Sequence, residues 1–343
     1  MKEIDLAAQT LFAELLQRSL DAEFDAEYRE NGHFSKKRSK DREYWHYQWR
    51  EGDNVRNKYV GPVSDASISD RVQRFSSLKA SFKRRQTLVR ALIAAGLPTP
   101  DPLSGRIVEA FWKAGFFRLR GVLVGTLAFQ TYAGVLGVGL SRRPLITQDA
   151  DFAQFWGVSE NIGESIEPPL KILKGVDESF RQVPNISDPF VSTRYRNKQD
   201  YLVDFLTPNR GSQDHQGKPV RMRALAGSGA EPLRHLDFLI YEPERSVLLH
   251  AGGVPVTIPR AERYAVHKLI VAVDRVNQAK SVKDIEQAAI LIDALSVRRP
   301  AELAEAWETA WSTGKEWRRK LESGRARLPT EAQGTLKRAV EGK

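Results

Sequence analysis

The chain has 343 residues, of which 41% are hydrophobic and 28% are charged. This length predicts two or three domains with a sizeable hydrophobic core, and the composition excludes a chain that is disordered throughout or collagen-like. The absence of cysteine excludes disulfide bonds, thiolate metal sites and a cysteine nucleophile. The net charge of +10 favours polyanionic partners, nucleic acid or nucleotide phosphates, although a solvated basic surface without such a partner explains it equally well.

The first hundred residues predict an N-terminal helical region that carries a hairpin. Apolar residues recur at helical spacing between residues 3 and 24, and the start lacks the basic and apolar pattern of a secretion signal, so we expect a cytoplasmic protein. Residues 33–62 alternate charged and aromatic side chains and predict a basic, aromatic β-hairpin. A long amphipathic helix is expected over 69–95, with Ser69 as its N-cap, followed by a proline-rich linker at 98–102.

Residues 101–258 predict an α/β core. We expect a helix over 105–114, a strand over 117–124, a turn at Gly125 and Thr126 that leads into a helix, a strand over 148–152, a helix near 168–182 and a hairpin of 190–196 with 201–206. Residues 208–231 predict a mobile loop, and strands are expected near 237–258. The uncharged stretch 121–140 contains five glycines and several polar residues, which favours a buried strand, turn and helix over a membrane span.

From residue 259 onward the pattern is helical, with segments near 260–277, 281–296 and 300–321. Several familiar site motifs are excluded. Residues 211–218 imitate a phosphate-binding loop, but five residues separate the glycines and Pro219 stands where a magnesium-binding hydroxyl is needed. Gly137 and Gly139 begin a dinucleotide fingerprint in which Arg142 replaces the third glycine. No histidine pair or serine elbow indicates zinc or serine hydrolysis.

Three aspartates form the candidate site that remains after these exclusions. Asp149 and Asp151 are two residues apart in TQDADF, so on a strand both carboxylates point to the same face. Asp204 interrupts the apolar strand YLVDFL in the same way. Carboxylates this close repel unless a cation neutralises them, and hard divalent ions prefer such oxygen ligands. The alternative is that the acids line an exposed sheet face.

The order of these elements carries a resemblance. A strand, a Gly-Thr turn, a helix, a strand with two aspartates and a later strand with one are found in GVLVGTLAFQTYAGVLG, TQDADFA and VDFLTP. Over roughly residues 120–210 this resembles the DNA polymerase β-like nucleotidyltransferase superfamily. Lys268 and Arg275 on one predicted helix, followed by a basic KSVKD turn and another helix, are similar to the helical half of minimal nucleotidyltransferases and nucleotidyltransferase toxins. The whole chain is similar to a bacterial nucleotidyltransferase-fold family of unknown substrate.

The resemblance implies an α+β fold with a polymerase β-like core, in which a mixed sheet is flanked by helices. We expect an N-terminal region at 1–100, the core at 101–258 and a C-terminal helical bundle at 259–343. The resemblance also implies the site residues. Its catalytic metal ligands for Mg²⁺ or Mn²⁺ would be Asp149, Asp151 and Asp204, and its nucleotide-binding residues would be Gly125, Thr126, Lys268 and Arg275. An ordinary solvated helix lysine remains the alternative for Lys268.

The implied function is transfer of an NMP from an NTP to a hydroxyl, with release of pyrophosphate. The acceptor, whether RNA, tRNA, protein or a small molecule, stays open, as do the preferred base and the oligomeric state, and no membrane partner is expected. The alternative is a non-catalytic nucleic-acid-binding protein on the same fold. Arg194 and Arg196 either face the same cleft or are solvated, and His267 is expected to be structural or exposed.

The basic hairpin has two interpretations of its own. Its cations are Lys36, Lys37, Arg38 and Arg42, and aromatic residues lie between and after them. Rings and cations in this arrangement bind single-stranded nucleic acid by stacking on bases and pairing with phosphates. Alternatively, the aromatic side chains pack against their own domain.

Overall fold

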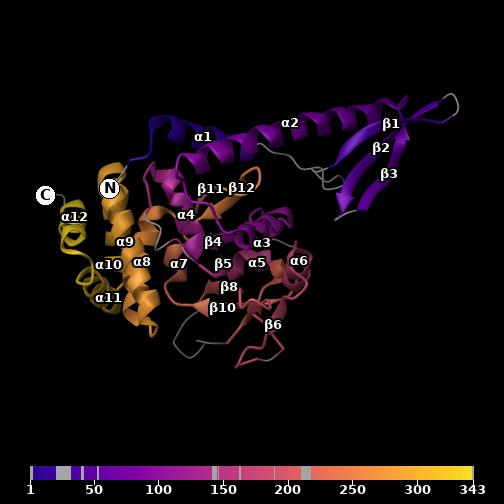
Figure 1. The fold of residues 1–343 in the computed structure, drawn as a ribbon. Helices are drawn as coiled ribbons and strands as arrows, with labels where there is room; N and C mark the ends of the chain where they lie inside the picture. Colours follow the sequence, from indigo (N-terminus) through magenta and orange to yellow (C-terminus); the bar gives the residue numbers. More distant parts are fainter. Residues whose placement is uncertain are drawn as a thin grey trace.

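The computed structural model describes residues 3–20, 32–39, 42–51, 54–140, 145, 147–161, 164–188, 190–209 and 218–341. A small β-sheet lies at one end of a long helix, and the other end of this helix packs on an α/β body with a helical bundle beside it (Figure 1). The structure is therefore of mixed α and β type, as the sequence predicts. In the described ranges, no helix is long and apolar enough to cross a membrane.

Helices α1 (Leu6–Leu20) and α2 (Ala66–Ala94) pack side by side on the body. Phe12 and Leu15 of α1 share an apolar cluster with Leu92 of α2. The buried guanidinium of Arg85 donates to the carbonyl of Gly252 at 3.1 Å. This contact ties α2 to the turn between β11 (Glu244–Leu248) and β12 (Val254–Ile258), which form a two-stranded antiparallel sheet.

The start of α2 differs from the expected one. The helix begins at Ala66, and the carboxylate of Asp65 accepts a hydrogen bond from the Ile68 amide at 3.4 Å. The predicted cap, Ser69, instead lies inside the helix and donates to the Val63 carbonyl at 3.0 Å. Asp65 thus takes the capping role, because a carboxylate one residue before the helix reaches its free amide groups.

The predicted hairpin is a three-stranded antiparallel sheet of β1 (His33–Ser39), β2 (Arg42–Glu51) and β3 (Asn54–Pro62). We call it the arm sheet. It lies at the end of α2 that is remote from the body (Figure 1). The third strand was not expected, because NVRNKYVGP is mostly polar and lacks a clear alternation.

The central sheet has the strand order β4 (Val122–Val124), β5 (Asp149–Ala153), β8 (Leu202–Pro208), β10 (Gly229–Leu233) and β9 (Val220–Arg221). β5 is parallel to β8 and antiparallel to β4. The first half of β8 pairs antiparallel with β7 (Arg194–Arg196), and β7 in turn pairs with β6 (Arg181–Val183). The second half of β8 is parallel to β10. Phe152 and Phe205 stack on the buried face, where Phe111 of α3 (Pro102–Lys113) packs against them.

Besides α3, the described helices of the core are α4 (Gly125–Leu136), α5 (Trp156–Asn161), α6 (Pro169–Val176) and α7 (Leu236–Leu239), together with a 3-10 turn at Arg223–Leu225. The expected loop at 208–231 is wrong in part, because β9 and the start of β10 lie in it; residues 210–217 are outside the described ranges. The strand expected from 117 begins only at Val122, after Arg120 adopts a left-handed φ of 62°. The helix expected near 168–182 ends at Val176, and α7 replaces the first strand residues expected after 237.

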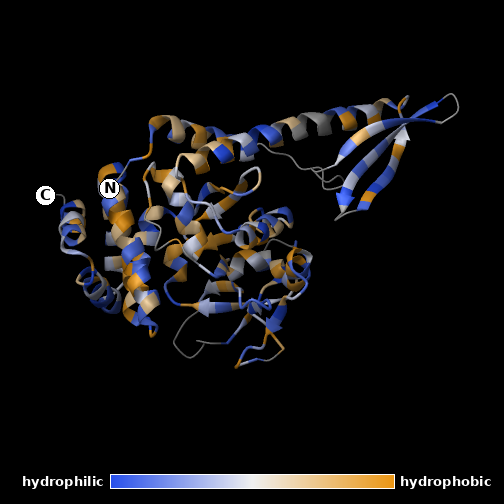
Figure 2. Cartoon of the chain, viewed as in Figure 1, coloured by the Kyte–Doolittle hydropathy of each residue, from blue (hydrophilic) through white to orange (hydrophobic). Residues whose placement is uncertain are grey.

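The C-terminal part is helical as predicted. It consists of α8 (Ala261–Asp274), α9 (Gln278–Arg298), α10 (Pro300–Ser312), α11 (Lys315–Arg325) and α12 (Thr330–Glu341). Figure 2 shows hydrophobic and hydrophilic residues interspersed along these helices, as expected of helices that each bury one side. α8 packs against α9, α10 and α11, and its Tyr264 also contacts the body.

Candidate active site

The three predicted aspartates lie on one face of the central sheet. On β5 the residues Ala150 and Phe152 are fully buried, whereas Asp149 and Asp151 are only half-buried on the other face. Asp151 lies in register with Asp204 on the parallel neighbour β8. Side chains in register on adjacent strands point to the same side of a sheet, about 5 Å apart. The fold thus brings together three carboxylates that are up to 55 residues apart in the sequence.

Gly125 lies directly beside these acids. Its φ of +66° is left-handed, and a Cβ at this position would come within 2.3 Å of Oδ2 of Asp151. α4 begins here, and no side chain of the described residues caps its first amide groups. The hydroxyl of Tyr264 on α8 lies 2.9 Å from the Gly125 carbonyl, which fixes this turn against the helical part. A free helix N-terminus next to a glycine is suited to bind phosphate.

A cleft of about 910 Å³ opens over this face. Strands β5 and β8, the start of α4, residues 183–187, residues 231–239 and the facing sides of α8 and α9 line it. All residues that the sequence predicts for the site lie at this cleft, namely Gly125, Thr126, Asp149, Asp151, Asp204, Lys268 and Arg275. A volume of this size accommodates a nucleotide.

The acids concentrate negative charge on the cleft floor. Burial and the charges of Asp149 and Asp204 raise the pKa of Asp151 to about 7, and the opposing charges of Lys268 and Lys280 only partly offset this increase. Thr147 donates its hydroxyl to Asp149. A carboxyl whose proton is retained up to neutral pH by burial and by neighbouring carboxylates marks a place where a cation would be favoured.

The guanidinium of Arg194 forms an ion pair with the carboxylate of Asp204. Its Nε lies 2.6 Å from Oδ1 and its Nη2 lies 2.9 Å from Oδ2, which is a two-pronged ion pair between neighbouring strands. Of the two strand arginines that the sequence singles out, only Arg194 lines the cleft. Arg196 instead pairs with Asp200 at 3.4 Å, in the turn before β8.

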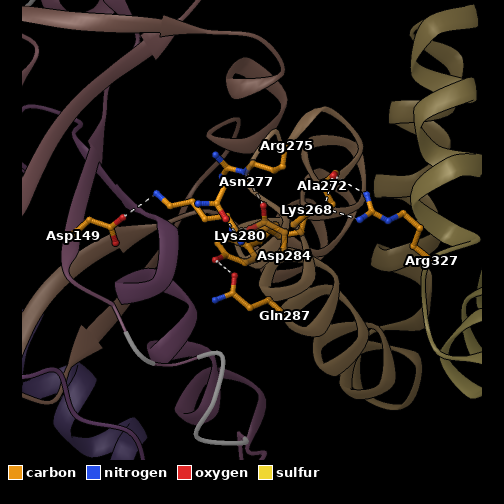
Figure 3. A network of polar contacts seen from close by, with 11 residues as sticks. Asp149, Lys268, Ala272, Arg275, Asn277, Lys280, Asp284, Gln287 and Arg327 are labelled. Atoms are coloured by element: carbon orange, nitrogen blue, oxygen red, sulfur yellow. Dashed lines mark hydrogen bonds and ion pairs between the residues drawn. The ribbon is translucent and has the colours of Figure 1, made fainter.

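A second ion-pair network lies on the helical wall (Figure 3). The buried Nζ of Lys268 is 2.5 Å from Oδ1 of Asp284, and Nε of Arg275 is 2.9 Å from Oδ2 of the same carboxylate. Lys268 has only 8% of its surface exposed, so the interpretation as a solvated lysine is wrong. Arg275 follows the last residue of α8, so the expectation that Lys268 and Arg275 lie on one helix is wrong. Asp284 on α9 brings the two cations together instead.

Two further basic residues of the cleft, Lys280 and Lys283, were not predicted from the sequence as site residues. The KSVKD segment predicted as a turn lies in the first turns of α9. Lys280 extends from α9 toward the sheet, and its Nζ is 3.7 Å from Oδ2 of Asp149 (Figure 3). Lys283 lines the same cleft, and burial lowers its pKa. The basic composition of KSVKD is the signal from which these two residues could have been found.

Two histidines at the cleft are held neutral. Burial and the adjacent charge of Lys268 lower the pKa of His267 to about 3. Burial and the charge of Lys320, whose Nζ is 3.2 Å from Nε2 of His235, lower the pKa of His235 to about 4. His267 is therefore a half-buried, uncharged part of the wall, close to the structural role expected for it.

The three aspartates offer carboxylate oxygens, the type of ligand that a hard divalent cation prefers. Among the described residues, no three His, Cys, Asp or Glu side chains converge closely enough to hold a metal as they stand. Two of the three aspartates are engaged by cations, since Asp204 is bound by Arg194 and Asp149 is approached by Lys280. The carboxylates nevertheless share one face, and burial together with the charges of Asp149 and Asp204 raises the pKa of Asp151. Release of Asp204 from Arg194 would give three oxygen donors of the type that Mg²⁺ and Mn²⁺ prefer.

Residues 103–312 match the model of a family described as nucleotidyltransferase. This match covers more than half of the chain. The chain belongs to this nucleotidyltransferase family. The matched range contains the three aspartates, the Gly125 turn and the basic residues of α8 and α9. Residues 3–70, which include α1 and the arm sheet, match a domain of unknown function. No curated protein and no solved structure matches the chain.

The family assignment agrees with the resemblance drawn from the sequence. A nucleotidyltransferase acts on a nucleotide, and the cleft has an acidic floor with a basic wall facing it. The family gives the class of reaction, whereas the roles of individual residues depend on the geometry described above.

Proposed function

We propose that this nucleotidyltransferase transfers an NMP from an NTP to a hydroxyl acceptor and releases pyrophosphate. One observation carries the proposal. Asp151 and Asp204 lie in register beside the left-handed Gly125 turn, inside the region that matches the family. An acidic site that abuts a free helix N-terminus offers a place for cations next to a place for phosphate.

In this proposal Asp149, Asp151 and Asp204 would hold Mg²⁺ or Mn²⁺. Such ions, when bound, neutralise phosphate charge and make a hydroxyl a better nucleophile. Groups of the chain itself would bind the phosphates. The amide groups at Gly125 and Thr126 would donate to the β- and γ-phosphates, because helix N-termini bind anions.

The basic wall would bind the remaining phosphate charge. Lys268 and Arg275 are held in place by Asp284, so they are positioned before a nucleotide enters. Lys280 is more exposed and extends across the cleft, so it can exchange Asp149 for a phosphate oxygen. Arg194 has the planar fork that suits phosphate as well as carboxylate, and a bound triphosphate would give it a partner other than Asp204.

The reaction is an in-line displacement. The acceptor oxygen forms a bond to the α-phosphorus while the bond from this phosphorus to the pyrophosphate oxygen breaks. The hydroxyl proton passes to the carboxylate of Asp204, and the pyrophosphate leaves along the basic wall. The chain contributes orientation and electrostatic stabilisation, which supply most of the rate enhancement in this type of chemistry.

The test is transfer of label from each α-³²P-labelled NTP, in Mg²⁺, to total cellular RNA or to total cellular protein. Asp149→Asn and Asp151→Asn each remove a charged ligand at nearly constant volume and should abolish transfer while the thermal melting curve is retained. Asp200→Asn is the matched control, since Asp200 is an exposed acid outside the cleft whose left-handed φ of 60° suits asparagine. Full transfer by either cleft variant would refute the proposal.

The alternative function is nucleic-acid binding without catalysis on this fold. The ion pair between Arg194 and Asp204 is the observation in its favour, because it neutralises one of the three acids. Under this alternative, no NTP gives transfer to any acceptor, and Asp151→Asn binds nucleic acid as the wild type does. Transfer by the wild type that is lost in Asp151→Asn excludes it.

A further inference from the structure

The arm sheet has one face that is turned away from α2. Residues directly opposite on antiparallel strands share a face, so the register of β1, β2 and β3 assigns each side chain. We call one of the two faces the open face. Its described members are His33, Ser35, Lys37, Arg42, Tyr44, His46, Gln48, Arg50, Val55, Asn57, Tyr59 and Pro62.

The opposite face is used for packing. Phe34 and Trp49 each contact the buried Tyr47, at ring separations of 5.0 and 5.6 Å. The indole nitrogen of Trp45 donates to Ser69 Oγ on α2 at 3.3 Å. Lys36 covers the Trp45 ring at 5.1 Å. These contacts explain most of the aromatic residues of the arm by ordinary packing, but they leave the aromatic residues of the open face unexplained.

The open face combines rings with positive charge. Tyr59 is 56% exposed, and its ring lies 5.8 Å from that of Tyr44 and 5.7 Å from that of His46. Lys37 lies directly opposite Tyr44 in the register. Two more exposed cations, Arg42 and Arg50, lie near the ends of β2. None of the described residues on this face is acidic.

We propose that the open face of the arm sheet binds single-stranded nucleic acid. Rings on an exposed sheet face offer platforms for bases, and cations on the same face meet the phosphates. At about 3.3 Å per residue, β2 is about 30 Å long, which is enough for several nucleotides in a row. Unpaired bases are required because a duplex buries the faces that Tyr44 and Tyr59 would stack on.

The charge pattern favours this partner over an acidic protein or a lipid surface. The described open face has rings, cations and amides, and its aliphatic side chains Val55 and Pro62 offer little to insert into a bilayer. An acidic protein segment would use the cations but not the rings. The proposal does not rest on the proposed catalysis, since the open face lies on the arm and shares no residue with the cleft.

The experiment is fluorescence anisotropy of the full chain with a labelled 20-nucleotide RNA, the DNA of the same sequence, and the corresponding DNA duplex, over a range of salt. We expect binding to the single strands to exceed binding to the duplex. Tyr59→Ser should weaken single-strand binding by about fivefold or more, the usual effect of losing one stacked base. The double variant Lys37→Gln with Arg50→Gln should lower the slope of log affinity against log salt by about 1.4.

Two controls lie on the body. Tyr241→Ser removes another half-exposed tyrosine, and Lys337→Gln with Arg338→Gln removes the same charge from the exposed side of α12. Both should bind as the wild type does. A failure of the catalytic proposal leaves this one intact, because the experiment measures binding to the arm and not transfer.

Several outcomes would overturn the inference. Absence of binding at low salt would do so, as would equal affinity for duplex and single strand. Arm variants that behave like the body controls would place the contact elsewhere on the basic surface. Binding to vesicles of anionic phospholipid that exceeds binding to RNA and DNA, and that falls in the arm variants, would assign the open face to a membrane surface instead.

Discussion

Replacement of Gly125 by alanine tests how closely the turn and the acids depend on each other. The alanine Cβ would lie 2.3 Å from Oδ2 of Asp151 and 3.3 Å from its Cγ, so the carboxylate must rotate away. The left-handed φ of +66° adds a backbone cost of about 1 to 2 kcal/mol for any residue with a Cβ. The substitution therefore combines a modest loss of stability with a displaced metal ligand.

Gly137 provides the matched control at the other end of the same helix. Its φ is +67°, so Gly137→Ala incurs the same backbone cost. The three atoms nearest to the added Cβ belong to the side-chain amide of Gln9, the closest at 2.7 Å, and this side chain can rotate away if it gives up its hydrogen bond to the Ile4 carbonyl. Both variants should lower the melting temperature by a few degrees. Only Gly125→Ala should reduce nucleotidyl transfer, by about 10²-fold, because a displacement near 1 Å at a reacting centre has an effect of this size.

The assay compares transfer rates and melting curves of both variants with the wild type. If Gly125→Ala keeps the wild-type rate, the Gly125 turn and Asp151 are not parts of one site. If Gly137→Ala loses as much activity as Gly125→Ala, the effect comes from general destabilisation of α4, and the argument from the Cβ contact is refuted.

Three further predictions follow from the ion pairs and the buried histidine. Arg194→Gln frees the Asp204 carboxylate and should tighten Mn²⁺ binding in calorimetry without nucleotide; unchanged or weaker binding would contradict this. Lys268→Met leaves the buried carboxylate of Asp284 with one partner fewer and should lower the melting temperature, whereas adding Asp284→Asn should restore most of the loss. The Lys268→Met variant should also lose more affinity for ATP than for AMP, and an equal loss would place Lys268 outside the triphosphate site. The pKa of His235 is lowered from 6.5 to about 4, so below pH 6.5 the unfolded chain takes up a proton that the folded chain does not. The free energy of unfolding therefore decreases as the pH falls from 6.5 toward 4. His235→Asn should therefore melt with a weaker dependence on pH between 6.5 and 4, and an unchanged dependence would refute the assignment.

The faces of the site strands were predictable from the sequence. In DADFA and LVDFLTP the buried residues alternate with the acids, and the structure has the same alternation. The contact between Asp151 and Asp204 depends on which strands become neighbours, which local pattern does not contain. The same holds for Asp284, which lies in a helix that the sequence predicts but whose role follows only from the packing of α8 against α9.

The missed elements have local causes. β10 begins at Gly229 and contains Pro232, so propensity argues against a strand, and its parallel pairing with β8 outweighs that preference. Arg275 was assigned to a helix because the apolar period continues up to it, yet α8 ends at Asp274 and Asn277 caps the next helix. The arm was recognised as basic and aromatic, but its division into a packed face and an open face follows only from the register. Of its four named cations, Lys37 and Arg42 are on the open face, whereas Lys36 and Arg38 are on the other.

The most direct test of the central claim is a calorimetric titration of the wild-type chain with a non-hydrolysable NTP analogue, first in Mg²⁺ and then in EDTA. The arrangement of Asp149, Asp151 and Asp204 beside Gly125 predicts binding with one nucleotide per chain in Mg²⁺ and its loss in EDTA. Asp151→Asn should bind weakly in both conditions. Equal affinity with and without the divalent cation would contradict a metal-dependent nucleotide site at these acids.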